Sequence, residues 1–223
     1  MRELGALDGV LYALDRALQS LSAGRARLYR YTLVAQPVPS APLLGPRRGR
    51  AIEVRPMTAD DPALAALPLD AAVLRHRFAQ DGVVCFGAFQ DGEVIGCLWL
   101  CLGPFLEDEV RCRFIPRPAG AAAWDFDVYI HPERRAGLAF ARLWDGANDY
   151  LRVRGIAWSF SRISLFNPGS LAAHARLGAR RVASATFLRL GAWQVMVAGP
   201  PLRLAAGWRR VPEVPLLPPR GDG

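Results

Sequence analysis

Apolar and polar residues follow two different periodicities in the middle of this chain, one typical of strands and one typical of helices. The apolar runs Val83–Phe89 and Val94–Leu102 flank the tetrapeptide Gln-Asp-Gly-Glu. An Asp-Gly pair between two apolar runs is the strongest short signal for a β-hairpin. We therefore predict two antiparallel strands here, preceded by a short strand at Ile52–Arg55 and by a helix that begins near Thr58.

A further strand and helix follow the hairpin. Trp124–Ile130 alternates polar with apolar residues, which predicts a strand that carries Asp125, Asp127 and Tyr129 on one face. The apolar residues of Leu138–Val153 have helical spacing instead. The sequence thus predicts a strand, a loop and a helix in succession.

The remaining pattern completes one domain. It predicts a strand at Ser161–Phe166, a short helix at Pro168–Leu177 and a closing hairpin of Arg180–Leu190 and Trp193–Ala198. Together these elements predict a single domain of the mixed α/β class over residues 51–198.

The two ends of the chain are predicted to lie outside that domain, in residues 1–50 and 199–223. Leucines at positions 4, 7, 11, 14, 18 and 21 form one stripe of a helix, which either packs on the domain's own surface or makes a short dimer seam. Arg27–Val38 is predicted to be extended, and the Pro-rich segment Pro37–Arg50 to be a linker or an ordered arm. The last nine residues, Pro215–Gly223, are predicted to be disordered.

The charge of the chain does not indicate a nucleic-acid partner. The formal net charge is +8, but all 28 basic residues are Arg and none is Lys. This bias is typical of a coding composition, and the arginines are scattered rather than gathered in a run interleaved with aromatic residues. We do not expect nucleic-acid binding.

Cysteine spacing and hydropathy indicate in which cellular compartment the protein is expected. Cys85, Cys97, Cys101 and Cys112 form no CxxC pair and lie near no histidine, so we predict reduced thiols and no metal site. The longest nearly uncharged apolar run, Val94–Leu106, is too short to cross a bilayer as a helix, and the N-terminus lacks the pattern of a signal peptide. We expect a soluble, cytoplasmic protein without a membrane span.

The segment HPERRAGLAFARL, residues 131–143, lies where the predicted strand ends and the helix begins. Such a loop directs unpaired backbone N–H groups and the positive end of a helix dipole toward an anion. Gly137 allows a close approach, and Arg134 and Arg135 add positive charge. Taken alone the loop is most often only a turn, and it is no Walker loop because no Lys follows.

At these residues the chain resembles a known family. YIHPERRAGLAFARLWDGA is similar to the strand, pyrophosphate loop and helix of the GNAT superfamily of N-acetyltransferases, whose loop motif is matched by Arg134, Gly137 and Ala139. IEVRPMTADD resembles the family's first strand, VVCFGAFQDGEVIGCLWL its second and third, and SLFNPGSLAAHARLGARRV its fifth strand, short helix and sixth strand. The resemblance covers residues 51–198. It implies an acyl-CoA N-acyltransferase fold, with a twisted, mainly antiparallel sheet that is flanked by helices and splayed between its fourth and fifth strands.

The resemblance also implies how the donor acetyl-CoA is bound. The loop would hold its pyrophosphate through the motif residue Arg134 and the backbone of Arg135, Ala136, Gly137, Leu138 and Ala139. The main chain around Val128 and Ile130 would pair with the pantetheine arm like an extra strand. Asn167 matches the family's Asn that contacts the cofactor near the splay.

Two catalytic roles follow from the same resemblance. Many members carry a Tyr seven residues after that Asn, which protonates the departing thiolate, and this chain has His174 there. His174 is either a general acid in its protonated form or a neutral residue packed on the helix. The amine must lose a proton, and Asp127 is the first candidate for the base, with Asp125 one step along the same face; both are equally well explained as surface acids. Glu109, in the acidic cluster Leu-Glu-Asp-Glu-Val, ranks below Asp127 because its segment would have to fold over the site.

These residues predict transfer of an acetyl group from acetyl-CoA to a primary amine by direct attack within a ternary complex. The acceptor would be a small-molecule or peptide amine, recognised by the connection Pro104–Ala123. Two alternatives stay open. One is a fold relative without catalysis, which assembles with partners or as a homodimer through the N-terminal helix; the other is an acyltransferase with a longer acyl-CoA or an aminoacyl-tRNA donor.

Overall fold

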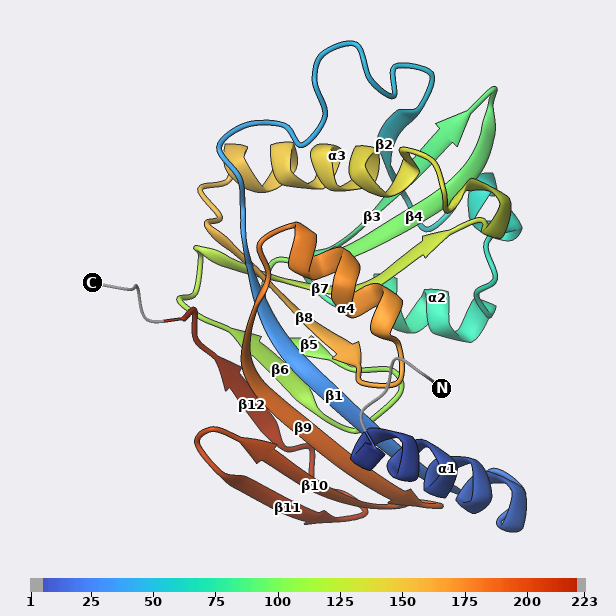
Figure 1. Cartoon of the computed structure of the whole chain (residues 1–223), viewed down its shortest axis with the longest axis vertical. Helices are drawn as coiled ribbons and strands as arrows, with labels where there is room; N and C mark the ends of the chain where they lie inside the picture. The colour runs from blue at the N-terminus through green and yellow to red at the C-terminus, as the bar shows by residue number, and fades with distance from the viewer. Residues whose placement is uncertain (1–5, 220–223) are drawn as a thin grey trace.

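The structure is a computed structural model that describes residues 6–219 (Figure 1). Within this range nine strands form one sheet in the order β11-β10-β9-β1-β8-β7-β4-β3-β2, and three more form a second sheet in the order β12-β6-β5. All neighbours in the large sheet are antiparallel except β7 and β8, which are parallel. The predicted mixed α/β class and mainly antiparallel sheet are confirmed.

The large sheet contains β1 (Ala26–Pro37), β2 (Glu53–Met57), β3 (Val83–Gln90), β4 (Glu93–Cys101), β7 (Ala122–Ile130), β8 (Trp158–Ser164), β9 (Arg180–Leu190), β10 (Trp193–Gly199) and β11 (Arg203–Gly207). The small sheet contains β5 (Phe105–Leu106), β6 (Arg113–Pro116) and β12 (Glu213–Leu216). The α-helices are α1 (Ala6–Leu21), α2 (Ala71–Phe78), α3 (Ala139–Val153) and α4 (Pro168–Arg176), and the 3-10 helices are η1 (Pro62–Ala66) and η2 (Pro132–Arg134).

The two faces of the large sheet are covered by different layers. Successive side chains of a strand point to opposite faces, so Leu98 and Leu100 of β4 pack toward α3, whereas Trp99 lies in the core on the other side. The face of α3 that meets the sheet carries Leu143, Trp144, Ala147 and Leu151, at helical spacing and fully buried. Figure 1 shows α3 and α4 in front of the sheet and the small sheet behind it.

The segment predicted to be extended and outside the domain is a strand inside the sheet. β1 lies between β8 and β9, pairing with β8 from Tyr31 to Pro37 and with β9 from Ala26 to Ala35. Its hydrophobic pattern indicates an extended chain but carries no information about which strands lie beside it. The sheet therefore begins at Ala26, well before residue 51.

Helix α1 packs against β1 through a buried carboxylate. Asp15 accepts a hydrogen bond of 2.8 Å from the backbone N–H of Leu28. Of the leucine stripe, Leu11 and Leu18 are partly buried and Leu14 and Leu21 are exposed, while position 4 lies outside the described residues. The helix thus packs on the surface of its own chain.

The C-terminal extension is also partly built into the fold. β12 pairs in parallel with β6, from Glu213 opposite Arg113 to Leu216 opposite Pro116. The prediction of disorder is therefore wrong for Pro215 and Leu216, and its last positions, 220–223, lie outside the described residues. In the part of the chain that is described, no helix is long and apolar enough to cross a membrane.

Candidate active site

The strands β7 and β8 pair only over a short stretch and then diverge. Their parallel register runs from Ala122 opposite Trp158 to Asp125 opposite Ser161. Beyond that point β7 continues to Ile130 beside β4 alone. A cleft of about 200 Å³ opens between the diverging strands, lined by β7, β8, the start of α4 and the loop between β5 and β6. This is the splay that the resemblance implies between the fourth and fifth strands of the domain.

A β-bulge at the mouth of the cleft separates the two aspartates of β7. Trp99 of β4 pairs with Asp127 and Leu100 pairs with Asp125, so Phe126 is the extra residue on β7. Asp125 consequently lies on the face that α3 and α4 cover, and Asp127 on the opposite face. The prediction that they share a face is wrong, because strict alternation holds only for a strand without a bulge.

Asp125 is fully buried beside the cleft. The Ser159 hydroxyl donates a hydrogen bond of 2.7 Å to its Oδ2. Burial raises the pKa of Asp125, while attraction from His174 and hydrogen bonds from Ser159 and Ser161 act in the opposite direction. The carboxyl group is thus held in an environment that favours its neutral form more than water does.

His174 of α4 faces the same cleft. Its ring lies edge-on to Phe140 and Trp144 of α3, with centroids 6.2 and 5.6 Å away. The residue is only 4% exposed, and its Nδ1 atom is buried without a hydrogen-bond partner among the described residues. A buried polar nitrogen without a partner is rare in native structures, and the residue that carries this one lines the cleft.

Asn167 lies at the start of α4, where its Oδ1 accepts a hydrogen bond of 3.0 Å from the N–H of Ser170 and so caps the helix. It also lines the cleft, together with His174. The two residues are seven positions apart, which is close to two helical turns, so both side chains lie on one side of α4.

The predicted pyrophosphate loop is exposed at the end of β7. Leu138 is the N-cap of α3, and no side chain among the described residues caps the helix there. The N–H groups of Arg135 and Gly137 donate within the loop, at 3.4 and 3.1 Å, and Arg135 also donates through Nε to the Ile130 carbonyl. The N–H groups of Ala136, of Leu138 and of the first turn of α3, from Ala139 on, have no partner among the described residues and are thus left for an anion.

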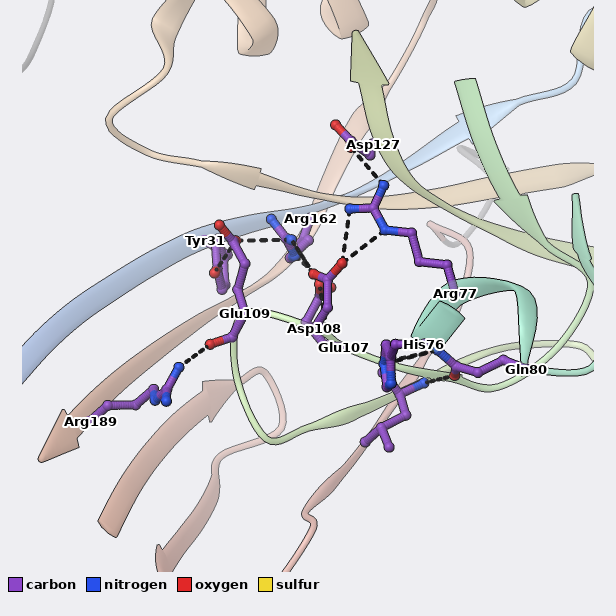
Figure 2. Close-up of polar contacts among 11 residues, drawn as sticks. Tyr31, His76, Arg77, Gln80, Glu107, Asp108, Glu109, Asp127, Arg162 and Arg189 are labelled. Atoms are coloured by element: carbon purple, nitrogen blue, oxygen red, sulfur yellow. Dashed lines mark hydrogen bonds and ion pairs between the residues drawn. The ribbon is translucent and has the colours of Figure 1, made fainter. Parts of the chain in front are cut away.

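The opposite face of the cleft carries a network of buried charges that sequence patterns did not indicate. Arg77 of α2 donates through Nη1 to Asp127 at 2.8 Å and through Nε to Asp108 at 2.9 Å (Figure 2). Its guanidinium lies over the rings of Trp99 and Phe126, 5.1 and 5.2 Å from their centroids. Asp127 is therefore a partner in an ion pair and not a free surface acid.

A second arginine anchors the other half of the same network. Arg162 of β8 binds Glu107 with two hydrogen bonds, of 2.5 and 2.8 Å, and approaches Glu109 Oε2 at 2.9 Å (Figure 2). Burial raises the pKa of Glu107 to about 7, although Arg162 acts in the opposite direction. The Tyr31 hydroxyl of β1 donates to Glu109 at 2.9 Å, and burial raises the pKa of Tyr31, which keeps it a neutral donor.

The acidic segment that contains Glu109 is thus folded over the cleft. This is the arrangement that the sequence requires if Glu109 is to act as the base. Glu109, Asp127, Asn167 and His174 line one cleft, although they come from three different segments of the chain. Arg134 lies elsewhere, on the wall of a wide groove of about 840 Å³ beside β2 and the β3–β4 turn. Sequence reasoning missed Arg77, because a lone arginine in a short helix has no distinguishing pattern.

Comparisons with known proteins bear on the fold. No family model matches the sequence, and no curated protein matches it. A candidate acetyltransferase of the GNAT family from Novosphingobium aromaticivorans is 18% identical, with 72% of this chain and 63% of that chain covered and a TM-score of 0.51.

Two further solved structures are less similar in shape. The aminoglycoside N-acetyltransferase AAC(6')-Iy in complex with CoA is 17% identical over 56% of this chain and 90% of its own, with a TM-score of 0.45. The aminoglycoside 6'-N-acetyltransferase AAC(6')-Ih from Acinetobacter baumannii is 19% identical over 57% of this chain and 89% of its own, with a TM-score of 0.43.

Proposed function

We propose, from the premise that this chain has the fold of the GNAT acetyltransferases, that it transfers an acetyl group from acetyl-CoA to a primary amine. The observation that carries the proposal is the cleft between β7 and β8, which is lined by His174, a residue whose buried Nδ1 has no hydrogen-bond partner among the described residues. An exposed and uncapped helix N-terminus follows β7. A fold alone does not define an activity, so the proposal depends on these residues.

The residues present fit the donor. Beyond Asp125 the edge of β7 that faces β8 has no strand partner within residues 6–219, so the main chain around Val128 and Ile130 is available to an extended amide-containing arm. The free N–H groups of Ala136 and of the first turn of α3 suit a pyrophosphate, with Arg134 adding charge. Asn167 lies at the splay of β7 and β8, between the free edge of β7 and the loop that suits the pyrophosphate.

The chemistry of the cleft then has two parts. His174 is the proposed general acid, because the residue lines the cleft and its Nδ1 has no competing partner among the described residues. Asp127 is the base that the sequence favours, but its Oδ2 is held by Arg77, so it can take up a proton only at Oδ1 or after that ion pair opens. Direct attack by the amine within a ternary complex needs no enzyme-bound acyl group.

Calorimetry with acetyl-CoA tests the proposal. A Cβ at position 137 would lie 3.3 Å from the Arg134 carbonyl oxygen, so in Gly137→Trp the loop has to shift by a few tenths of an ångström. We expect this variant to bind acetyl-CoA about tenfold more weakly or worse, a loss of about 1.4 kcal/mol or more. Gly45→Trp is the matched control, since nothing lies within 4 Å of that position, and it should bind like the wild type.

Two results would contradict the proposal. One is no binding of acetyl-CoA to the wild type, and the other is equal affinity in the wild type and Gly137→Trp. Mass spectrometry of ligands that co-purify with the protein distinguishes an acetyl group from a longer acyl group on the same donor.

A further inference from the structure

A single carboxylate borders two pockets. Glu109 lines the cleft between β7 and β8, and it also lines a second pocket of about 350 Å³ between its own loop and the β9–β10 turn. We propose that this second pocket binds the acceptor amine and that Glu109 is the general base that removes its proton. The inference rests on the proposed function and names the acceptor side of that same site.

The second pocket is built by segments outside the motifs of the resemblance. The loop between β5 and β6 is fixed to β10 by Gln194, whose side chain accepts from the Arg111 N–H at 2.8 Å and donates to the Arg111 carbonyl at 2.7 Å. The Arg111 guanidinium donates to the carbonyls of Arg210, Ala192 and Gly207. The pocket wall is therefore held in place by hydrogen bonds, and Arg111 is occupied.

The lining indicates the class of amine. Leu106, Val110, Ala192 and Val211 supply an apolar surface, and the volume lies at the lower end of the range for small-molecule sites. The lining carries three carboxylates, of Glu107, Asp108 and Glu109, against the two guanidinium groups of Arg111 and Arg189, so a single negative charge is in excess when all are ionised, which suits one ammonium group rather than a polycation. The structure thus fits a compact monoamine with an apolar stem.

Glu109 has the geometry of a proton acceptor. Its Oε2 binds both the Tyr31 hydroxyl and Arg162, while its Oε1 has no hydrogen bond to the described residues, and the side chain is 48% exposed. Arg162 is shared with the fully buried Glu107. Asp127 lines the cleft but not the second pocket, so Glu109 is the carboxylate at their junction.

The charge of the surrounding network favours a cationic acceptor. The network contains four carboxylates and two guanidinium groups, which leaves two negative charges in excess when all are ionised. The carboxylates are those of Glu107, Asp108, Glu109 and Asp127, and the guanidinium groups are those of Arg77 and Arg162. An ammonium group beside Glu109 reduces this excess. The buried, unpartnered Nδ1 of His174 marks the far wall of the cleft as the place of the second proton transfer.

The proton balance closes with these two residues. Glu109 accepts one proton from the ammonium group, and the neutral nitrogen forms a bond to the thioester carbonyl carbon. As the carbon–sulfur bond breaks, His174 donates its proton to the sulfur. The amide nitrogen then loses its second proton, which restores the protonated His174, and Glu109 releases its proton to the solvent. One proton is released for each amide formed.

Steady-state kinetics with 2-phenylethylamine, read as release of the free CoA thiol, test the assignment. Glu109→Gln should lower kcat/KM by about 10²-fold or more at pH 8 and abolish the acid limb of the pH profile, with acetyl-CoA affinity unchanged. Asp127→Asn should lower it by less than about tenfold. Spermidine should be acetylated less efficiently than 2-phenylethylamine.

A second pair of variants tests the pocket by a different route. Ala192→Phe, on the exposed turn that lines the pocket, should raise KM for 2-phenylethylamine without changing acetyl-CoA affinity. Val195→Phe, at an exposed position of the same hairpin outside the pocket, is the control and should leave KM unchanged.

The failures are distinguishable. If acetyl-CoA does not bind, the proposed function itself is wrong. If acetyl-CoA binds and the amine is acetylated, but Glu109→Gln is as active as the wild type or Asp127→Asn is the more damaged variant, the role of Glu109 is overturned and the proposed function survives. Binding of acetyl-CoA with no acetylation of either amine, or an unchanged KM in Ala192→Phe, overturns the acceptor pocket.

Discussion

The two walls of the cleft hold their carboxylates by different physical means. On the wall toward α3 and α4, Asp125 is buried among hydroxyl groups and near an imidazole, and burial raises its pKa. On the wall toward α2, Asp127 and Glu109 are held by the guanidinium groups of Arg77 and Arg162. One wall controls charge by desolvation and the other by ion pairing, so removing a partner should cost more stability on the ion-paired wall, and on both walls the cost should fall as the carboxylate takes up a proton.

Loss of the central arginine should have the largest effect on stability. Arg162→Leu leaves the fully buried Glu107 without its two hydrogen bonds. Removing one partner of a buried ion pair typically costs about 3–5 kcal/mol of the free energy of unfolding at neutral pH. Urea unfolding at pH 8 and at pH 5 measures the loss, which should be smaller at pH 5 because Glu107 then takes up a proton.

Two variants bracket that result. Asp149→Ala removes a surface ion pair with Arg152 and should cost no more than about 1 kcal/mol. Arg162→Leu combined with Glu107→Leu removes both buried charges and should recover most of the lost stability. If the double variant is no more stable than Arg162→Leu, the loss has another cause than the unpaired carboxylate.

The raised pKa of Glu107 predicts a decline in stability with pH. The folded-state pKa of about 7 exceeds the ordinary value of 4.5, so the folded protein binds more protons than the unfolded chain between these pH values. Stability from this group is fully present below about pH 4.5 and is lost as the pH rises through about 7, by roughly 3 kcal/mol in all. Glu107→Gln should lack this decline in urea unfolding.

Comparing the wild type with Glu107→Gln isolates the contribution of the Glu107 carboxyl group to the pH dependence of stability. The three histidines of the chain are present in both proteins, so their contributions cancel in the difference. A wild type that gains stability over Glu107→Gln as the pH rises would show that the sign is wrong.

The two walls also differ in how far the sequence predicts them. β7, the loop with Gly137, α3, β8 and α4 follow each other along the chain, and periodicity and turn residues therefore predict them. The network of Arg77, Arg162 and Glu107 joins segments that are far apart in sequence, and it depends on β1 lying inside the sheet. Periodicity describes which way one segment faces and carries no information on its distant partners. The bulge at Phe126 escaped prediction for a related reason, since it arises from pairing with β4.

The smallest predicted effect tests the desolvated wall. Ser159→Ala removes the 2.7 Å hydrogen bond to Asp125, and leaving that buried acceptor with one donor fewer should cost about 1 kcal/mol at pH 8. Because this bond favours the charged carboxylate, the pKa of Asp125 should rise further above its ordinary value and the loss should shrink toward acidic pH. Urea unfolding of Ser159→Ala measures this loss of stability. Ser20→Ala, at an exposed position of α1, is the control. The same loss at pH 5 and pH 8 would mean that Asp125 does not change its charge in this range, and that the contrast between the two walls lies only in their geometry.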